Sequence, residues 1–193
     1  MESKRSFFMV DSSSSDKKEI VVDYFLSWTL RCASDGGLEY YNNERLVCYC
    51  RRILSVLLFD NPSKIKEYRI KSVKTWKQWK QIDLCAEIIL ENKSGEEEKY
   101  ALLMENKVYT RLHGNQLERY KEIFEAEYHD SKFNLRYVYF TCHDDFGDDK
   151  VSCNENGFQA YTMDDVYNKA SEYEEFELTG NALFDEFWLS NWG

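Results

Sequence analysis

Residues 82–107, IDLCAEIILENKSGEEEKYALLMENK, decide the fold of this chain. Two largely apolar runs, Ile82 to Glu91 and Lys99 to Lys107, flank Asn92-Lys93-Ser94-Gly95, whose residue types favour a tight turn. The pattern predicts an antiparallel hairpin. Pairing counted outward from the Ser94-Gly95 turn brings Asp83 opposite Glu105, at the open end of the hairpin.

The second strand of this hairpin ends in Glu105-Asn106-Lys107. Residues two apart in a strand point to the same face, so Glu105 and Lys107 point one way and Asn106 the other. The preceding residues 101–104, ALLM, are apolar and predict a buried, central strand. Charged groups at the end of such a strand are costly without partners. Two carboxylates and a lysine are therefore expected to converge at the open end.

The surrounding sequence predicts helices on either side of three strands. Helical periodicity is expected over residues 16–32 and over residues 44–59, the latter capped by Asn43 or Asn42. A strand follows over residues 66–76. After the hairpin come a helix from His113 or Asn115 to about Tyr128 and a strand over residues 135–141. This strand–helix–strand order predicts an α/β fold whose mixed sheet is completed by a crossover connection.

Length and composition fit one domain with a sizeable core, since the chain has 193 residues, 43% of them hydrophobic. Residues 1–15, which end in four serines, predict a flexible N-terminus. Residues 16–193 are expected to form a single domain with an acidic helical C-terminal part that includes helices over residues 163–173 and 182–192. No apolar run reaches the roughly 18 residues of a membrane span, so a cytoplasmic protein without membrane contact is expected. The six cysteines are then interpreted as reduced thiols, mostly buried.

Charge is unevenly distributed along the chain. The net charge of −10 argues against binding nucleic acid through overall charge. Nine basic residues nevertheless fall between Arg51 and Ile82, opposed by only two acids, whereas thirteen acids and two bases follow from Asp144 to the end. Solvated surface is one explanation of both segments. The alternative for the acidic part is an interaction with a basic protein partner.

Two converging carboxylates favour a particular chemistry. Carboxylates at hydrogen-bonding distance repel each other unless a proton or a cation lies between them. An oxygen-lined site of this kind suits Mg²⁺ or Mn²⁺, with water and a substrate phosphate completing the coordination. Lys107 is expected to position the attacking water or to offset negative charge that develops on the phosphate. The alternative is a buried Asp–Lys–Glu ion network that only supports the hairpin.

Gln116 and Tyr120 extend the candidate site. They are four residues apart and so lie on one helix face, and residues 108–114 form a short connection from the strand that ends at Lys107. Gln116 is expected to orient the water or contact the lysine, and Tyr120 to brace Gln116 or touch a phosphate. Tyr120 also belongs to an apolar stripe with Leu117 and Phe124, so core packing is the alternative for its side chain.

Basic and aromatic residues alternate just before Asp83. Aromatic rings and cations together suit stacking on unpaired bases and contact with phosphates. The alternative is a strand end whose tryptophans, Trp76 and Trp79, belong to the core. The residues predicted to contact nucleic acid are Lys74, Trp76, Lys77 and Lys80.

Taken together, Ile82-Asp83, Glu105-Asn106-Lys107 and Gln116-Leu117-Glu118-Arg119-Tyr120 resemble the PD-(D/E)XK nuclease superfamily. The resemblance covers roughly residues 21–141 and is closest to the bacterial branch with E-N-K followed by Q-L-x-x-Y. It implies a restriction-endonuclease-like mixed sheet flanked by helices, in the order αβββαβ, and Mg²⁺- or Mn²⁺-dependent hydrolysis of phosphodiester bonds. It also implies Asp83, Glu105 and the backbone carbonyl of Asn106 as metal ligands, and Lys107 as the catalytic lysine.

The chain departs from the superfamily pattern in three places. Ile82 replaces the proline of the motif, and the strand before Asp83 has Glu67 as its only acid. The glutamate that the superfamily often carries on its first core helix is matched best by Glu44, with Glu39 as the alternative.

The expected function is a metal-dependent nuclease acting on DNA, in phage defence or DNA processing. One alternative is a catalytically silent module that binds a protein partner through its acidic C-terminal part. Another is a nuclease whose affinity for DNA is supplied by a partner protein, because the chain itself is strongly acidic.

Overall fold

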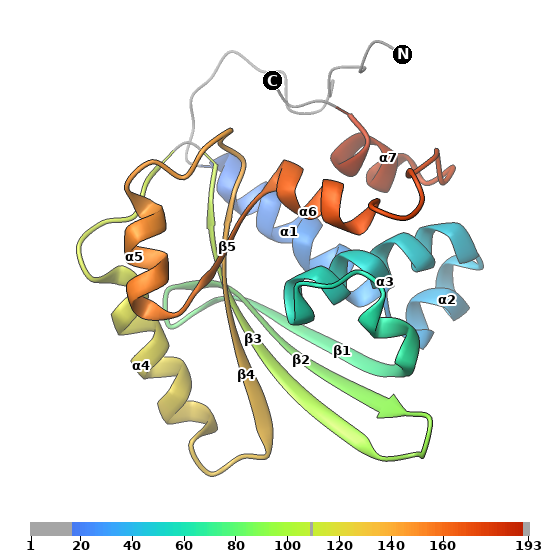
Figure 1. The fold of residues 1–193 in the computed structure, drawn as a ribbon, viewed down its shortest axis with the longest axis horizontal. Helices are drawn as coiled ribbons and strands as arrows, with labels where there is room; N and C mark the ends of the chain where they lie inside the picture. The colour runs from blue at the N-terminus through green and yellow to red at the C-terminus, as the bar shows by residue number, and fades with distance from the viewer. Residues whose placement is uncertain (1–16, 109, 191–193) are drawn as a thin grey trace.

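The computed structural model describes residues 17–108 and 110–190, so the predicted flexible segment 1–15 lies outside the described residues. In these ranges the chain forms a five-stranded mixed sheet with helices on both faces, the predicted α/β class (Figure 1). The strands lie side by side in chain order. They are β1 (Tyr68–Trp79), β2 (Ile82–Asn92), β3 (Glu97–Lys107), β4 (Phe133–Thr141) and β5 (Gln159–Thr162).

The hairpin of β2 and β3 has the predicted register. Leu84 pairs with Met104, and Glu91 pairs with Glu97 beside the turn. One further step along the same register sets Asp83 opposite Glu105. Gly95 in the turn has a φ of 85°, which a residue without a Cβ adopts readily.

Strand β1 reaches Trp79, three residues beyond the predicted end, because a second tight hairpin joins it to β2. Trp79 pairs with Ile82, and the two residues between them, Lys80 and Gln81, both have positive φ, 50° and 72°. Two consecutive positive φ values are typical of the type I′ turn that matches the twist of paired strands. The segment that is rich in lysine and tryptophan is therefore a projecting hairpin tip.

The crossover predicted after β3 is present. Helix α4 (Gln116–Tyr128) connects β3 to β4, and these strands run parallel, with Met104 beside Val138. Strand β5 adds a further parallel strand next to β4. The sheet thus combines an antiparallel half, β1 to β3, with a parallel half, β3 to β5.

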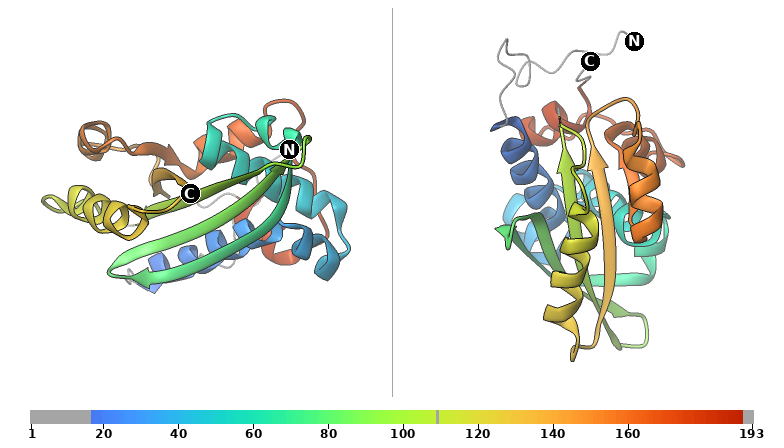
Figure 2. Two further views of the ribbon diagram at one scale, coloured as in Figure 1. Left: turned by 90° about the horizontal axis from the view of Figure 1, so that it is seen from below. Right: turned by 90° about the vertical axis from the view of Figure 1, so that its left-hand side faces the viewer.

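The helices divide between the two faces of the sheet, and each face has its own core (Figures 1 and 2). One core contains Leu54, Leu102 and Phe140, and the other contains Leu103 and Phe124. None of the helices within residues 17–108 and 110–190 combines the length and the apolar character needed to cross a membrane. The first face carries α1 (Lys17–Cys32), α2 (Asp35–Tyr41), α3 (Glu44–Phe59), α6 (Met163–Ala170) and α7 (Ala182–Trp188), and the second carries α4 and α5 (Asp149–Asn156).

Several short elements were not predicted. One of them is α2, which Ser34 caps by accepting a hydrogen bond from the amide of Gly37 (3.3 Å). A Cβ on Gly37 would lie 2.3 Å from the carbonyl oxygen of Cys32, so only glycine fits this close approach. Helix α5 and strand β5 were also missed, as was the short 3₁₀ helix η1 (Lys64–Glu67). Asn43, one of the two predicted caps, accepts from the amide of Leu46 and begins α3.

The six cysteines are free thiols, and four of them are buried, as expected. The acidic C-terminal part folds back onto α3. Arg52 pairs with Glu174, and Arg45 pairs with Glu177 at 3.4 Å. Part of the negative charge of this segment is therefore neutralised within the chain.

Candidate active site

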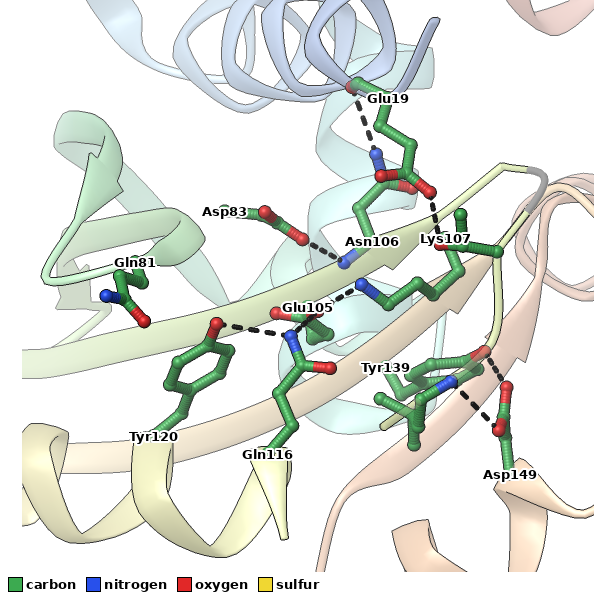
Figure 3. A network of polar contacts seen from close by, with 12 residues as sticks. Glu19, Gln81, Asp83, Glu105, Asn106, Lys107, Gln116, Tyr120, Tyr139 and Asp149 are labelled. Atoms are coloured by element: carbon green, nitrogen blue, oxygen red, sulfur yellow. Dashed lines mark hydrogen bonds and ion pairs between the residues drawn. The ribbon is translucent and has the colours of Figure 1, made fainter. Parts of the chain in front are cut away.

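Glu105 and Lys107 lie together at the open end of the β2–β3 hairpin (Figure 3). The Lys107 Nζ is 2.7 Å from the Glu105 Oε1. The Glu105 side chain is fully buried, and that of Lys107 is 9% exposed. Strand parity places them on one face, as the sequence predicted.

Asp83 completes the cluster from the neighbouring strand. Its Oδ2 accepts a hydrogen bond from the backbone amide of Asn106 (2.9 Å), and its Oδ1 accepts one from Gln78 Nε2 (3.1 Å). After burial, the charge of Asp83 contributes most to the raised pKa of Glu105, so the two carboxyl groups lie close together. Two such carboxyl groups repel each other when both are ionised.

Burial and mutual repulsion shift the pKa values of this cluster. Burial, and next the charge of Asp83, raise the pKa of Glu105 to about 8. Burial also raises the pKa of Asp83. For Lys107, burial opposes the charged form, but Glu105 and Asp83 outweigh it and raise the pKa above its usual value. The lysine is thus held as a cation beside the Glu105 carboxyl group, which retains a proton near neutral pH.

Gln116 and Tyr120 reach the cluster from the first turns of α4. Gln116 Nε2 donates hydrogen bonds to Glu105 Oε1 (2.6 Å) and to the Tyr120 hydroxyl (3.1 Å). Tyr120 is 4% exposed and packs in the same core as Leu117 and Phe124. The Tyr120 side chain therefore packs in the core and also contacts Gln116. Gln116 contacts Glu105 rather than Lys107.

Helix α1 supplies acidic residues that sequence reasoning missed. Asn106 points to the opposite face from Glu105, where its Nδ2 donates to Asp23 Oδ1 (3.1 Å) and to the backbone oxygen of Glu19 (3.3 Å). Glu19 Oε1 in turn accepts from Thr110 Oγ1 (2.7 Å). Burial, and next the charge of Asp83, raise the pKa of Asp23 to about 7.

A polar stripe on α1 could have revealed these residues. Glu19, Asp23 and Ser27 recur every four residues, which puts them on one helix face. Asp23 and Ser27 are each 1% exposed, so this stripe faces inward in a helix whose other inward residues are largely apolar.

The structure does not bring Glu44 or Glu39 into the cluster, which corrects the expected position of the helix acid. Glu44 lies in the first turn of α3 and lines a separate pocket with Arg51 and Lys66. The expectation assumed that α3 was the core helix next to the hairpin end, whereas α1 occupies that place. Glu67 is also remote and pairs with Lys64 at 2.5 Å.

The cluster contains polar atoms that lack partners. Within the described part of the chain, three buried side-chain atoms have no hydrogen-bond partner: Glu105 Oε2 and Gln116 Oε1 in this cluster, and Asn106 Oδ1 on the opposite face of the sheet, toward α1. Buried oxygens are rarely left unpaired, so their concentration here indicates a place where something else binds. An unpaired carboxylate oxygen next to a second carboxylate fits a divalent cation.

The donor set is small, however. Between residues 17 and 190, with residue 109 left aside, no three Asp, Glu, His or Cys side chains are grouped so that they could hold a metal ion together. Two carboxylates suit Mg²⁺, which keeps several waters and takes further oxygens from a substrate phosphate.

The predicted nucleic-acid contacts at the hairpin tip divide between two faces. Lys74 and Trp76 share one face of β1, and Trp76 is 40% exposed. The Lys77 Nζ lies 4.0 Å from the centroid of the Tyr24 ring, on the α1 side of the sheet. The Lys80 Nζ lies 4.4 Å from the centroid of the Trp79 ring and 3.1 Å from Glu127 Oε2 on α4. The structure does not therefore gather all four side chains on one surface.

Comparison with protein families agrees with the restriction-endonuclease-like fold. The model of the PD-(D/E)XK nuclease superfamily matches residues 7–180 of this chain. The chain therefore belongs to this superfamily. The match extends well beyond residues 21–141, over which the sequence motifs were recognised. Searches of curated proteins and of solved structures found no match.

Proposed function

We propose that this protein is a nuclease that hydrolyses phosphodiester bonds in DNA with the help of Mg²⁺ or Mn²⁺. The observation that carries the proposal is the convergence of Asp83, Glu105 and Lys107 around a buried carboxylate oxygen that has no partner. A network built only for stability would pair that oxygen, because an unpaired buried acceptor costs about 1–3 kcal/mol.

Asp83, Glu105 and the backbone carbonyl of Asn106 would hold the metal ion. When bound, the ion would lower the pKa of a water molecule and stabilise negative charge on the phosphate. Gln116 holds Glu105 Oε1 and so leaves Oε2 available for the ion. The hydrogen bond from the Asn106 amide fixes Asp83 Oδ2.

Lys107 acts on the phosphate as a cation. Its raised pKa keeps the ammonium charged, so it offsets the negative charge that develops during hydrolysis. The unpaired Oε1 of Gln116 is an acceptor for a proton of the attacking water. Tyr120 fixes the orientation of Gln116 through its hydroxyl.

Glu19 and Asp23 act as positioning residues. They hold the Asn106 side chain and the segment just after β3 from the α1 side. The backbone that presents Glu105 and Lys107 is thereby fixed on both faces of the sheet. The superfamily resemblance favours phage defence or DNA processing as the setting of the activity, and the net charge of −10 favours a partner protein that adds affinity for DNA.

The test is cleavage of linear, circular and single-stranded DNA with Mg²⁺, with Mn²⁺ and with EDTA. Lys107→Met removes the ammonium and keeps most of the apolar stem, and we expect it to abolish cleavage. Lys99→Met is the matched control, since Lys99 lies on the same strand with the same parity, eight residues earlier. Absence of metal-dependent cleavage on every substrate, or equal cleavage by the Lys107 variant, would rule out the proposal.

A further inference from the structure

A cavity next to the candidate active site has no part in the chemistry proposed above. It has a volume of about 170 Å³ and lies between the tip of the β1–β2 hairpin and α4. Figure 2 shows this hairpin tip extending alongside α4. Five of its seven lining residues are apolar and two are acidic: Trp76, Trp79, Cys85, Phe124, Tyr128, Glu87 and Glu127.

The cavity continues the aromatic face of α4 that begins in the site. Tyr120, Phe124 and Tyr128 are spaced by four residues and form one stripe. At about 1.5 Å per residue, Phe124 and Tyr128 lie about 6 and 12 Å along the helix from Tyr120. Successive nucleotides of a strand are about 3.4 Å apart in a duplex. An unpaired DNA strand can be more extended, so one with its scissile phosphate at the site would bring a base up to about four positions away to the cavity.

On the side formed by the β1–β2 hairpin, the cavity is open to an approaching DNA strand. Helix α4 packs on β3 and β4, whereas the Trp76 ring on β1 is 40% exposed. Trp76 on β1 lies opposite Cys85 on β2, and Lys74 lies opposite Glu87. Because Lys74 and Trp76 are two residues apart, the lysine lies beside the tryptophan on the same face of β1. Lys80 stands over Trp79 on the other side of the opening. A cavity with aromatic walls and lysines at its opening suits a nucleobase, which stacks on the rings, and its phosphates, which contact the lysines.

The acidic lining adds a chemical preference. Glu87 Oε1 accepts a hydrogen bond from the Tyr128 hydroxyl (3.1 Å), and Glu127 pairs with Lys80. A carboxylate accepts hydrogen bonds from the exocyclic amino group of cytosine, adenine or guanine. The only ring N–H donor of an unpaired thymine, at N3, lies between the O2 and O4 acceptors, which a carboxylate repels.

We propose that this cavity binds an unpaired nucleobase of the DNA strand being cut and prefers bases that carry an amino group. The base lies between the tryptophans of the hairpin tip and the ring of Tyr128, with its amino group toward Glu87. The inference rests on the proposed nuclease function and narrows its substrate to single-stranded or locally unpaired DNA, since a paired base cannot enter a side cavity.

Binding without cleavage tests this inference separately from catalysis. Fluorescence anisotropy with labelled oligodeoxycytidine, oligodeoxythymidine and duplex DNA, in EDTA at one fixed salt concentration, reports affinity alone. We expect cytidine strands to bind more tightly than thymidine strands and duplexes. Trp76→Ala should weaken binding of cytidine strands about 5- to 150-fold, the range for loss of one stacked base. Trp76→Phe should restore much of it.

Two further variants keep the result interpretable. Tyr40→Ala removes an aromatic ring that is 81% exposed on α2, away from the cavity, and should leave binding unchanged. Glu87→Gln should remove the preference for cytidine over thymidine, since an amide both donates and accepts. Thermal melting of each variant verifies that it is folded.

Equal binding of cytidine strands by wild type and Trp76→Ala overturns the inference, as does equal binding of both pyrimidines by the wild type. If DNA is still cleaved with Mg²⁺ or Mn²⁺ in that case, the nuclease function stands and the base pocket does not. If binding depends on Trp76 and on the type of base but the protein cleaves no DNA, the base pocket is supported and the proposed nuclease function is ruled out.

Discussion

The two ends of the β2–β3 hairpin are built in opposite ways. At the turn, Asn92 Oδ1 accepts hydrogen bonds from the amide of Ser94, the hydroxyl of Ser94 and the amide of Glu96, at 2.9, 2.6 and 2.9 Å. Glu97 there lies near the surface and pairs with Lys71 at 2.8 Å. At the open end, Glu105 is buried, its pKa is raised to about 8, and one of its oxygens has no partner.

The two ends of the hairpin therefore differ in what they contribute. The turn contributes to stability, whereas the open end forms the candidate active site. Hydrogen bonds and Lys71 lower the pKa values of the turn carboxylates, Glu96 and Glu97, whereas burial raises those at the open end. A chain selected for stability alone would not bury adjacent carboxyl groups when polar or apolar replacements cost less. The proposed metal ion would supply further positive charge at this end, beside that of Lys107.

The largest expected effect is on cleavage. Asp83→Asn keeps the size of the side chain but removes a carboxylate from the open end, and we expect it to lower the cleavage rate by about 100- to 1,000-fold. Glu97→Gln makes the same chemical change beside the turn and should leave the rate unchanged. Steady-state rates on one DNA substrate measure both, and equal losses would erase the distinction between the two ends.

The next effect is a gain in stability. Glu105→Gln removes an anion that burial and Asp83 disfavour, so the metal-free protein should become more stable at pH 8.5, by roughly 1–3 kcal/mol. The melting temperature in EDTA should then rise by about 2–12 °C for a chain of this length. A lower melting temperature would mean that the cluster stabilises the fold, as in the ion-network alternative.

The pH dependence of stability also distinguishes the open end of the hairpin from the turn. The pKa of Glu105 is about 8 in the folded protein, against an ordinary value of 4.5. The folded state therefore holds more protons between these values, and stability falls as pH rises through this window. Asp23, with a pKa of about 7, acts with the same sign. Urea unfolding in EDTA from pH 5 to 8 should show the decline, at up to about 1.4 kcal/mol per pH unit for each proton, and Glu105→Gln should reduce it.

The smallest effect concerns the turn itself. Asn92→Ala removes an acceptor of three hydrogen bonds at the protein surface and should lower the free energy of unfolding by about 0.5–1.5 kcal/mol. Cleavage should remain at the wild-type rate, since the turn is at the far end of the hairpin. Chemical denaturation and the DNA assay, run on the same preparation, measure the two quantities.

The sequence predicted the parts of the fold that depend on strong periodic patterns. The register of β2 and β3 followed from their apolar runs and a turn rich in small polar residues, and α3 followed from its apolar stripe and from Asn43. Helices α2 and α5 and strand β5 have eight residues or fewer. Segments this short and polar contain too few apolar positions for a period to be recognised.

Within the candidate site, the residues of β2, β3 and α4 could be predicted because strand parity and helix spacing fix their directions. The contribution of α1 could not be predicted in the same way. Asp23 meets Asn106 across 83 residues of sequence, so only the packing of the helix on the sheet brings them together. Glu44 was expected because it lies early in a predicted helix, as the superfamily's helix glutamate does, but that helix packs farther from the hairpin end.

Metal-linked thermal stability tests the central claim most directly, that a divalent cation completes the open end of the hairpin. Melting temperatures are measured for wild type, Asp83→Asn and Glu97→Gln, in EDTA and with increasing Mn²⁺ or Mg²⁺. At 100 times the dissociation constant, a bound ion adds about 2.7 kcal/mol, or a rise of about 5–10 °C. We predict this rise for wild type and Glu97→Gln and its loss in Asp83→Asn. An equal response of all three proteins, or no response from the wild type, would contradict the account.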